Sequence, residues 1–177
     1  MSKMTKISIE KLDKLDQRDL LDLCDATEAT MLDSDGFTIG FRQWQPPLRS
    51  DLEAYFKGVM MIPNRHLIVA RVDSTIAGSI QLLFAQQNTY SYFSVSVDNH
   101  FVAPWARNFG IAKQLLEFAE NYAREKGSKV ITLSVCANME KAVNLYERTK
   151  YKRWGVLKKH AIIGQEFING YFYCKDL

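Results

Sequence analysis

The sequence predicts an α/β fold with a mixed, mostly antiparallel sheet of about seven strands, flanked by about four helices. Strand-like segments outnumber helix-like ones and occur in runs, which is typical of an α+β arrangement. One helix-like segment, at 111–126, lies between two strand-like segments and suits a single parallel crossover. The length of 177 residues is typical of one domain, so we expect a single domain over 1–177.

The individual elements follow from hydrophobic periodicity. The strand-like segments either alternate apolar with polar residues or form short apolar runs, and they cover 5–10, 66–72, 76–84, 90–102, 130–136, 153–163 and 166–175. The helix-like segments repeat apolar residues three or four positions apart, and they cover 15–31, 50–60, 111–126 and 139–149. Ser50 or Asp51 is placed to cap the second of these helices.

Composition excludes several classes of protein. The apolar content of 47% and the charged content of 24% are those of an ordinary globular protein. A net charge of +3 is too small to indicate nucleic-acid binding, although a basic span at 148–159 is either a solvated face or a patch for phosphates. The three cysteines lack zinc spacing, so we expect no metal site. Neither a signal peptide nor an apolar run of membrane-spanning length is found, and the expected location is the cytoplasm, away from membranes.

One stretch, Val102 to Lys113, lies where an alternating strand passes through a short turn into an amphipathic helix. The first backbone N–H groups of a helix have no partners within it, and the helix dipole is positive at that end, so the position suits an anion. Arg107 adds a permanent positive charge, and Gly110 lets a ligand approach the backbone. We therefore expect this stretch to form a cradle for a diphosphate.

The stretch resembles the acyl-coenzyme A signature of the GNAT superfamily of N-acetyltransferases, which is met here by Val102, Pro104, Arg107, Gly110 and Ala112. The resemblance implies a sheet splayed at a V-shaped gap and acetyl-CoA as cosubstrate. It also implies pantetheine contacts from the backbone of the preceding strand and diphosphate contacts from the arginine and the turn. The cofactor-binding residues implied in this way are Phe101, Val102, Arg107, Asn108, Phe109, Gly110, Ile111, Ala112 and Lys113.

A second segment, from Asn138 to Tyr146, is similar to another GNAT motif, an asparagine followed by an alanine and a tyrosine. The resemblance implies that Tyr146 is the general acid for the departing thiolate and that Asn138 contacts the pantetheine arm. Two departures stand out. The usual asparagine position is occupied by Met139, so Asn138 is alternatively a helix cap, and the glycine that usually ends this helix is Lys150.

The implied reaction is transfer of an acetyl group from acetyl-CoA to a primary amine, of a small molecule or a peptide, by direct attack in a ternary complex. The alternative is a non-catalytic acyl-CoA-binding module of the same fold. Asp98 and His100 are weak candidates for the base, because alternation places them on one strand face. A homodimer is possible, and no nucleic-acid partner is expected. Six aromatic residues either line an acceptor pocket or belong to the core: Phe37, Phe41, Trp44, Trp154, Phe167 and Tyr171.

Overall fold

A computed structural model describes residues 5–33 and 47–177 of the chain. The strands are β1 (Ile7–Lys11), β2 (Arg65–Val72), β3 (Thr75–Phe84), β4 (Ser94–Val102), β5 (Val130–Cys136), β6 (Lys152–Ile163) and β7 (Glu166–Asp176). The helices are α1 (Gln17–Asp33), α2 (Arg49–Met61), α3 (Ile111–Glu125) and α4 (Glu140–Arg148), with a short 3₁₀ turn, η1, at Pro104–Ala106.

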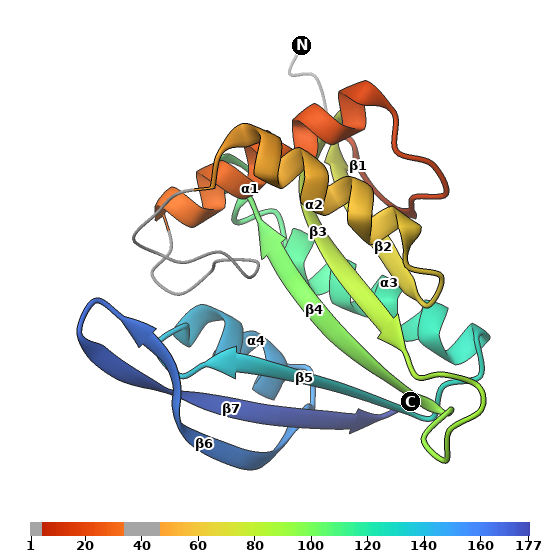
Figure 1. The fold of residues 1–177 in the computed structure, drawn as a ribbon, viewed down its shortest axis with the longest axis vertical. Coiled ribbons are helices and arrows are strands. Elements are labelled where there is room, and N and C mark those ends of the chain that lie inside the picture. The colour runs from red at the N-terminus through yellow and green to blue at the C-terminus, as the bar shows by residue number, and fades with distance from the viewer. Residues whose placement is uncertain (1–4, 34–46) are drawn as a thin grey trace.

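The seven strands form one sheet in the order β1-β2-β3-β4-β5-β7-β6, which confirms the predicted mixed fold. Every neighbouring pair is antiparallel except β4 and β5, which are parallel and joined through α3. The parallel pairing covers only Ser94–Ser96 against Val130–Thr132. Beyond these residues the two strands diverge, and Figure 1 shows the V-shaped opening that results.

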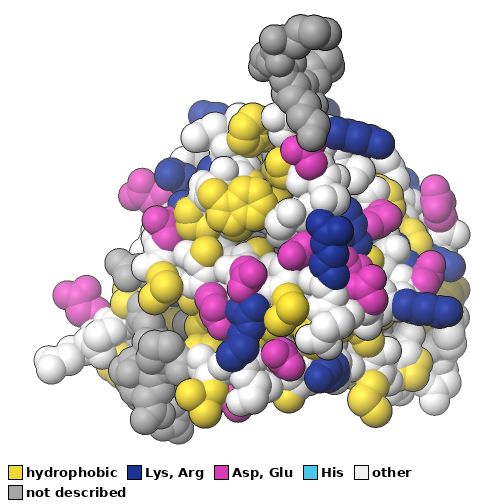
Figure 2. Space-filling model, turned by 90° about the horizontal axis from the view of Figure 1, so that it is seen from above, with side chains coloured by type: hydrophobic (Ala, Val, Ile, Leu, Met, Phe, Trp, Pro, Cys, Tyr) yellow, Lys and Arg dark blue, Asp and Glu magenta, His cyan; other side chains and the backbone are white. Residues whose placement is uncertain are grey.

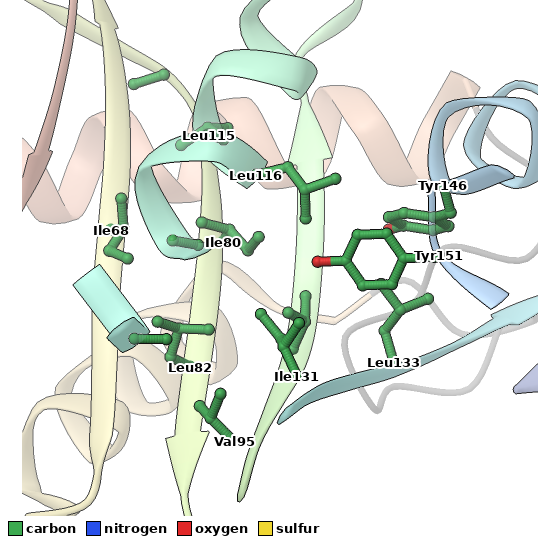
Figure 3. Packing of buried hydrophobic residues seen from close by; sticks show 14 of the residues in the cluster. Ile68, Ile80, Leu82, Val95, Leu115, Leu116, Ile131, Leu133, Tyr146 and Tyr151 are labelled. Carbon is green, nitrogen blue, oxygen red and sulfur yellow. The ribbon is translucent and has the colours of Figure 1, made fainter. Parts of the chain in front are cut away.

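The helices cover the two faces of the sheet unequally. Helices α1 and α2 pack over the β1–β4 half on one face, and α3 packs on the other (Figure 1). Leu115 and Leu116 of α3 are fully buried against a layer that includes Ile80 and Leu82 (Figure 3). Each fully buried leucine contributes about 1.5–3 kcal/mol of hydrophobic stabilisation, so α3 and the helix start it carries are firmly held.

Strand β4 begins at Ser94, four residues later than the sequence pattern predicted. Residues 90–93 instead form turns, because Thr89 donates its hydroxyl to the Gln86 carbonyl and the Ser94 hydroxyl donates to the Ser91 carbonyl. Such local side-chain bonds compete with strand pairing. The prediction for this end of the strand was therefore wrong.

A β-bulge interrupts the middle of β4. On β3, Ser79 pairs with Phe101 and Gln81 pairs with Asp98, so two residues of β4 lie opposite Ile80 alone. The first of them, Asn99, has a positive φ of 47°. One extra residue reverses the facing of the strand beyond it, and the expectation that Asp98 and His100 share a face is wrong.

The start of α2 also differs from the prediction. Its N-cap residue is Leu48, and neither Ser50 nor Asp51 occupies that position. Asp51 is the third helical residue, and its Oδ2 accepts a hydrogen bond of 3.0 Å from the Leu48 N–H. An acidic side chain in the first turn also suits the positive end of the helix dipole.

Among the described helices, none combines the length and the apolar composition that crossing a bilayer requires. The face seen from above in Figure 2 carries acidic and basic side chains interspersed with hydrophobic ones. On this face neither sign of charge forms a continuous field.

Candidate active site

The predicted diphosphate cradle lies at the start of α3. Asn108 and Gly110 have positive φ angles of 69° and 71°, and the residue between them does not, so the turn alternates in handedness. Such alternation directs successive backbone N–H groups to one side and forms an anion-binding concavity. Gly110 is the N-cap residue, and because glycine has no side chain, it leaves the first N–H groups of α3 without a side-chain cap. Among the described residues, the N–H groups of Asn108 to Lys113 have no hydrogen-bond acceptor.

Arg107, the cationic residue of this cradle, has a partner that the sequence did not reveal. Its Nη1 donates to Oδ2 of Asp33, the last residue of α1. Both side chains are partly exposed, at 32% and 47%. The ion pair holds the guanidinium beside the cradle, and its carboxylate competes with any incoming phosphate for the same charge.

The end of β4 presents its backbone toward the V-shaped gap. The Ala103 N–H donates to the Ala77 carbonyl at 2.7 Å, on the side of β3. Because consecutive strand residues direct their backbone groups to opposite edges, those of Val102 face the gap. The backbone of Phe101 faces β3 instead, since its carbonyl oxygen lies directly against the position that a Cβ of Gly78 would take. This geometry favours Val102 over Phe101 as a pantetheine contact.

Tyr146 lies on the inner face of α4 and is 5% exposed. Its ring packs against those of Tyr151 and Tyr173, with centroid distances of 5.8 and 6.2 Å, and Figure 3 shows it next to Tyr151. The Tyr146 hydroxyl lies 3.1 Å from Nδ1 of His100. The bulge in β4 therefore directs His100 across the gap toward α4.

His100 connects Tyr146 to the helix that carries the cradle. Its Nε2 lies 3.0 Å from the carbonyl oxygen of Ala112, in the first turn of α3. A carbonyl only accepts, so Nε2 carries the hydrogen, and Nδ1 of the neutral ring accepts from the Tyr146 hydroxyl. Burial lowers the pKa of His100 to about 4, which keeps the ring neutral at physiological pH.

Burial also raises the pKa of Tyr146 above that of an ordinary phenol. The desolvated site disfavours the phenolate, so the hydroxyl keeps its proton throughout the physiological range. A buried, protonated phenol is suited to donate a hydrogen bond to a developing negative charge. Full transfer of its proton to a thiolate is uphill, because a thiol is the stronger acid.

One family of known proteins matches most of this chain. Residues 28–151 match the family described as "Acetyltransferase (GNAT) family".

The chain belongs to the GNAT acetyltransferase family.

Two relatives of known sequence show how far the likeness extends. An uncharacterised N-acetyltransferase from Azospirillum brasilense is 42% identical over 97 residues, covering 54% of this chain and 58% of the relative. The uncharacterised N-acetyltransferase YhfO of Bacillus subtilis is 30% identical over 104 residues, covering 56% and 67%. The chain thus spans between about half and two thirds of the curated relatives it matches.

Solved structures of this family share the whole fold. An N-acetyltransferase from Staphylococcus aureus Mu50 has a TM-score of 0.78 at 18% identity, with 97% of this chain and 98% of that chain covered. A putative acetyltransferase from Salmonella typhimurium, solved with its cofactor acetyl-CoA, has a TM-score of 0.76 at 12% identity, with 97% and 94% covered. At these identities the likeness concerns the fold.

The structure shows the backbone at the two positions that depart from the GNAT pattern. The N-cap residue of α4 is Met139, so Asn138 lies one position before the cap and is not the cap residue. Lys150 adopts a positive φ of 70° just after α4, the left-handed geometry in which glycine is usual. The backbone shape is therefore kept although the residue differs.

A polar network that no local sequence pattern predicts lies on the α2 side of the bulge. Arg65 donates from Nη1 to Gln81 Oε1 at 2.8 Å and to Asp98 Oδ2 at 3.0 Å. The Tyr55 hydroxyl accepts from Gln81 Nε2 at 3.1 Å and from Asn99 Nδ2 at 2.5 Å. These residues come from α2, β2, β3 and β4, so only the folded chain brings them together.

The six aromatic residues that the sequence offered for an acceptor pocket divide into three groups. Tyr171 is partly buried and packs against the core. Phe37, Phe41 and Trp44 lie outside the described residues. Trp154 and Phe167 are more than half exposed on the last hairpin, so neither is a core residue.

Proposed function

We propose that the protein is an acetyl-CoA-dependent N-acetyltransferase that acetylates a primary amine by direct attack. The observation that carries the proposal is the arrangement around His100. One imidazole bonds both to the first turn of the cradle helix and to the buried hydroxyl of Tyr146. The anion-binding turn and the proton donor are thereby held in fixed relation across the gap between β4 and β5.

The cradle supplies the binding part of this function. The unpartnered N–H groups from Asn108 to Lys113 suit the diphosphate of coenzyme A, and Arg107 adds charge beside them. The Val102 backbone, which faces the gap, suits an amide of the pantetheine arm. An N–H at this position also suits polarisation of the thioester carbonyl.

Tyr146 assists the departure of the thiolate leaving group. Before the reaction the ammonium group loses one proton. The neutral amine nitrogen then forms a bond to the acetyl carbon, the carbon–sulfur bond breaks, and the nitrogen releases a second proton. This second proton reaches the thiolate through solvent, so the products are the amide and the free thiol of coenzyme A. The Tyr146 O–H faces His100 in the free protein and turns toward the sulfur to stabilise it by a hydrogen bond. His100 is not the base in this scheme, because its lowered pKa makes it a poor proton acceptor at neutral pH.

Asp98 is better placed than His100 to hold the protonated amine before the amine releases a proton to solvent. Its carboxylate lies on the α2 side of β4, one residue before the bulge, and its side chain is 39% exposed. One oxygen, Oδ2, accepts from Arg65. The other is open to an incoming ammonium group.

Calorimetric titration with acetyl-CoA tests the cradle. We expect the parent protein to bind and Gly110→Glu to lose binding, because a carboxylate would occupy the anion site. The matched control is Gly127→Glu at the far end of α3, where φ is also positive, at 89°. Both variants carry similar backbone strain, so equal loss of binding in the two would contradict the proposal.

A thiol-release assay with a panel of primary amines tests the chemistry. Tyr146→Phe is expected to lower kcat about 10²-fold while acetyl-CoA affinity is kept, because only the hydrogen bond to the leaving sulfur is lost. Acetyl-CoA binding with no amine acetylated would instead favour the non-catalytic acyl-CoA module.

A further inference from the structure

A pocket of about 530 Å³ lies on the α2 side of β4, next to the bulge. Its apolar wall comes from α2 and the residue after it, and its polar floor comes from β2 and β4. The lining residues are Ala54, Tyr55, Gly58, Val59, Ile62, Arg65, Asp98 and Asn99. The volume falls in the range of small-molecule sites and is too small for a folded partner.

Some hydrogen-bonding groups of the pocket floor have partners, and others have none among the described residues. The Nη1 of Arg65 is shared by Gln81 and Asp98, and its buried Nε has no partner and no access to solvent. Asp98 uses Oδ2 for Arg65, and Asn99 uses its amide N–H₂ for Tyr55. Among the described residues, the oxygens Asp98 Oδ1 and Asn99 Oδ1 accept no hydrogen bond. The floor thus offers free acceptors next to an apolar wall, one of them charged.

We propose that this pocket holds the acceptor substrate, and that the acceptor is a small aliphatic primary amine without a carboxylate. The inference rests on the proposed acetyltransferase function. An ammonium group supplies three donors and no acceptor, which complements the two open oxygens. A short alkyl chain packs on Val59, Ile62 and the open surface at Gly58.

We expect the substrate to lack a carboxylate because Arg65 is already paired with Asp98. This arginine is the cation that lines the pocket, and its side chain is only 17% exposed. A substrate carboxylate would have to share this guanidinium with Asp98 and would lie beside that carboxylate. Like charges at such a distance are unfavourable. α-Amino acids should therefore be poor acceptors.

The position of the pocket fits the chemistry of the gap. Asp98 and Asn99 contact the network on the α2 side, and the next residue, His100, bonds to Tyr146 on the other side. Beyond Ser96, β4 has no pairing with β5 that would close the sheet at this level. An amine at Asp98 would thus lie across β4 from the Tyr146 hydroxyl, at a level where this edge of β4 is not paired with β5.

A steric variant tests the pocket without touching the cradle. A Cβ at Gly58 meets no heavy atom within 4 Å, so Gly58→Phe should fold and direct its ring into the pocket. Replacing a helix-interior glycine also removes its poor helix propensity. We expect KM for n-pentylamine to rise at least ten-fold, with acetyl-CoA affinity unchanged in calorimetry. The matched control is Lys57→Phe, the neighbouring exposed position outside the pocket, which should behave as the parent protein.

A substrate pair tests the charge argument. The parent protein should acetylate n-pentylamine with kcat/KM at least ten-fold higher than norleucine, which has a similar chain and an added carboxylate. Asp98→Asn should lower kcat/KM for n-pentylamine at least ten-fold and leave acetyl-CoA binding unchanged.

The outcomes separate the two proposals. Preference for norleucine, or equal KM in Gly58→Phe and Lys57→Phe, would overturn the pocket inference and leave the cradle intact. Failure of the parent protein to bind acetyl-CoA would overturn the acetyltransferase proposal itself.

Discussion

His100 should make the free energy of unfolding depend on pH in the acidic range. Its pKa is about 6.5 in the unfolded chain and about 4 in the fold, because burial disfavours the charged ring. Between these values the unfolded state binds more protons, so the free energy of unfolding falls as pH is lowered from about 6.5 to about 4. We expect a loss of about 2–3 kcal/mol from this group. Urea denaturation across this range, compared with His100→Gln, measures it, and an equal pH dependence in both proteins would contradict the assignment.

Asp33 should weaken the binding of acetyl-CoA. Its carboxylate pairs with Arg107, so the diphosphate must compete for that guanidinium. Asp33→Asn is expected to tighten acetyl-CoA binding two- to five-fold at low salt, since exposed ion pairs of this kind amount to about 0.2–1 kcal/mol. Asp25→Asn is the control, because Asp25 also lies on α1 but pairs with Arg49. Unchanged or weaker binding in Asp33→Asn would show that the pair orients Arg107 productively.

The sequence can mark candidate residues whose structural setting depends on near neighbours in the chain. The strand–turn–helix at Gly110 fixes a local backbone shape, and Tyr146 has a recognisable spacing from Ala142 on one helix. Asp33 lies 74 positions before Arg107, and Arg65 lies 33 before Asp98. No local pattern marks such partners, because their side chains meet only after the sheet has formed.

At the scale of single elements, the end of α4 is strained at Lys150. A lysine with φ of 70° has its Cβ too close to the neighbouring carbonyl, at a cost of about 1–2 kcal/mol. Lys150→Gly relieves this but makes the unfolded chain more flexible. We expect a net rise of about 0.5–1 kcal/mol in the free energy of unfolding, measured by urea denaturation.

The control for this prediction is Lys152→Gly, two residues on and already in β6. Glycine weakens a strand interior, so this variant should be less stable than the parent protein. If both variants lost stability equally, strain at Lys150 would not be the cause.

The bulge in β4 is a feature that the sequence pattern does not predict. Val95 and Val97 alternate regularly, and the pattern predicts that Asp98 and His100 share a face. The extra residue at Asn99 separates them, so that Asp98 lies at the pocket and His100 lies at Tyr146. An asparagine tolerates the left-handed backbone better than most residues, but asparagines occur in many ordinary turns and strands, so Asn99 alone was no signal.

For the whole molecule, the order of elements was enough to predict the mixed sheet and its single parallel crossover. Alternation and helical spacing are properties of each segment, and a strand–helix–strand unit has few alternatives. The extent of the parallel contact was not predictable in this way. It depends on where β4 and β5 diverge, which is decided by the packing of α3 and of Tyr146 between the two halves.

The short junction between β4 and β5 has a consequence for how the chain folds. Strands β2 and β3 pair with near neighbours in sequence, as do β6 and β7, whereas the strand pairing between the two halves covers three residue pairs, and α3 separates the paired strands in sequence. Local pairings close short loops and form early, and the distant one must wait for them. We therefore expect an assembly intermediate that contains both hairpins but lacks the contact between Tyr146 and His100, so that the candidate site is completed only when the two halves join.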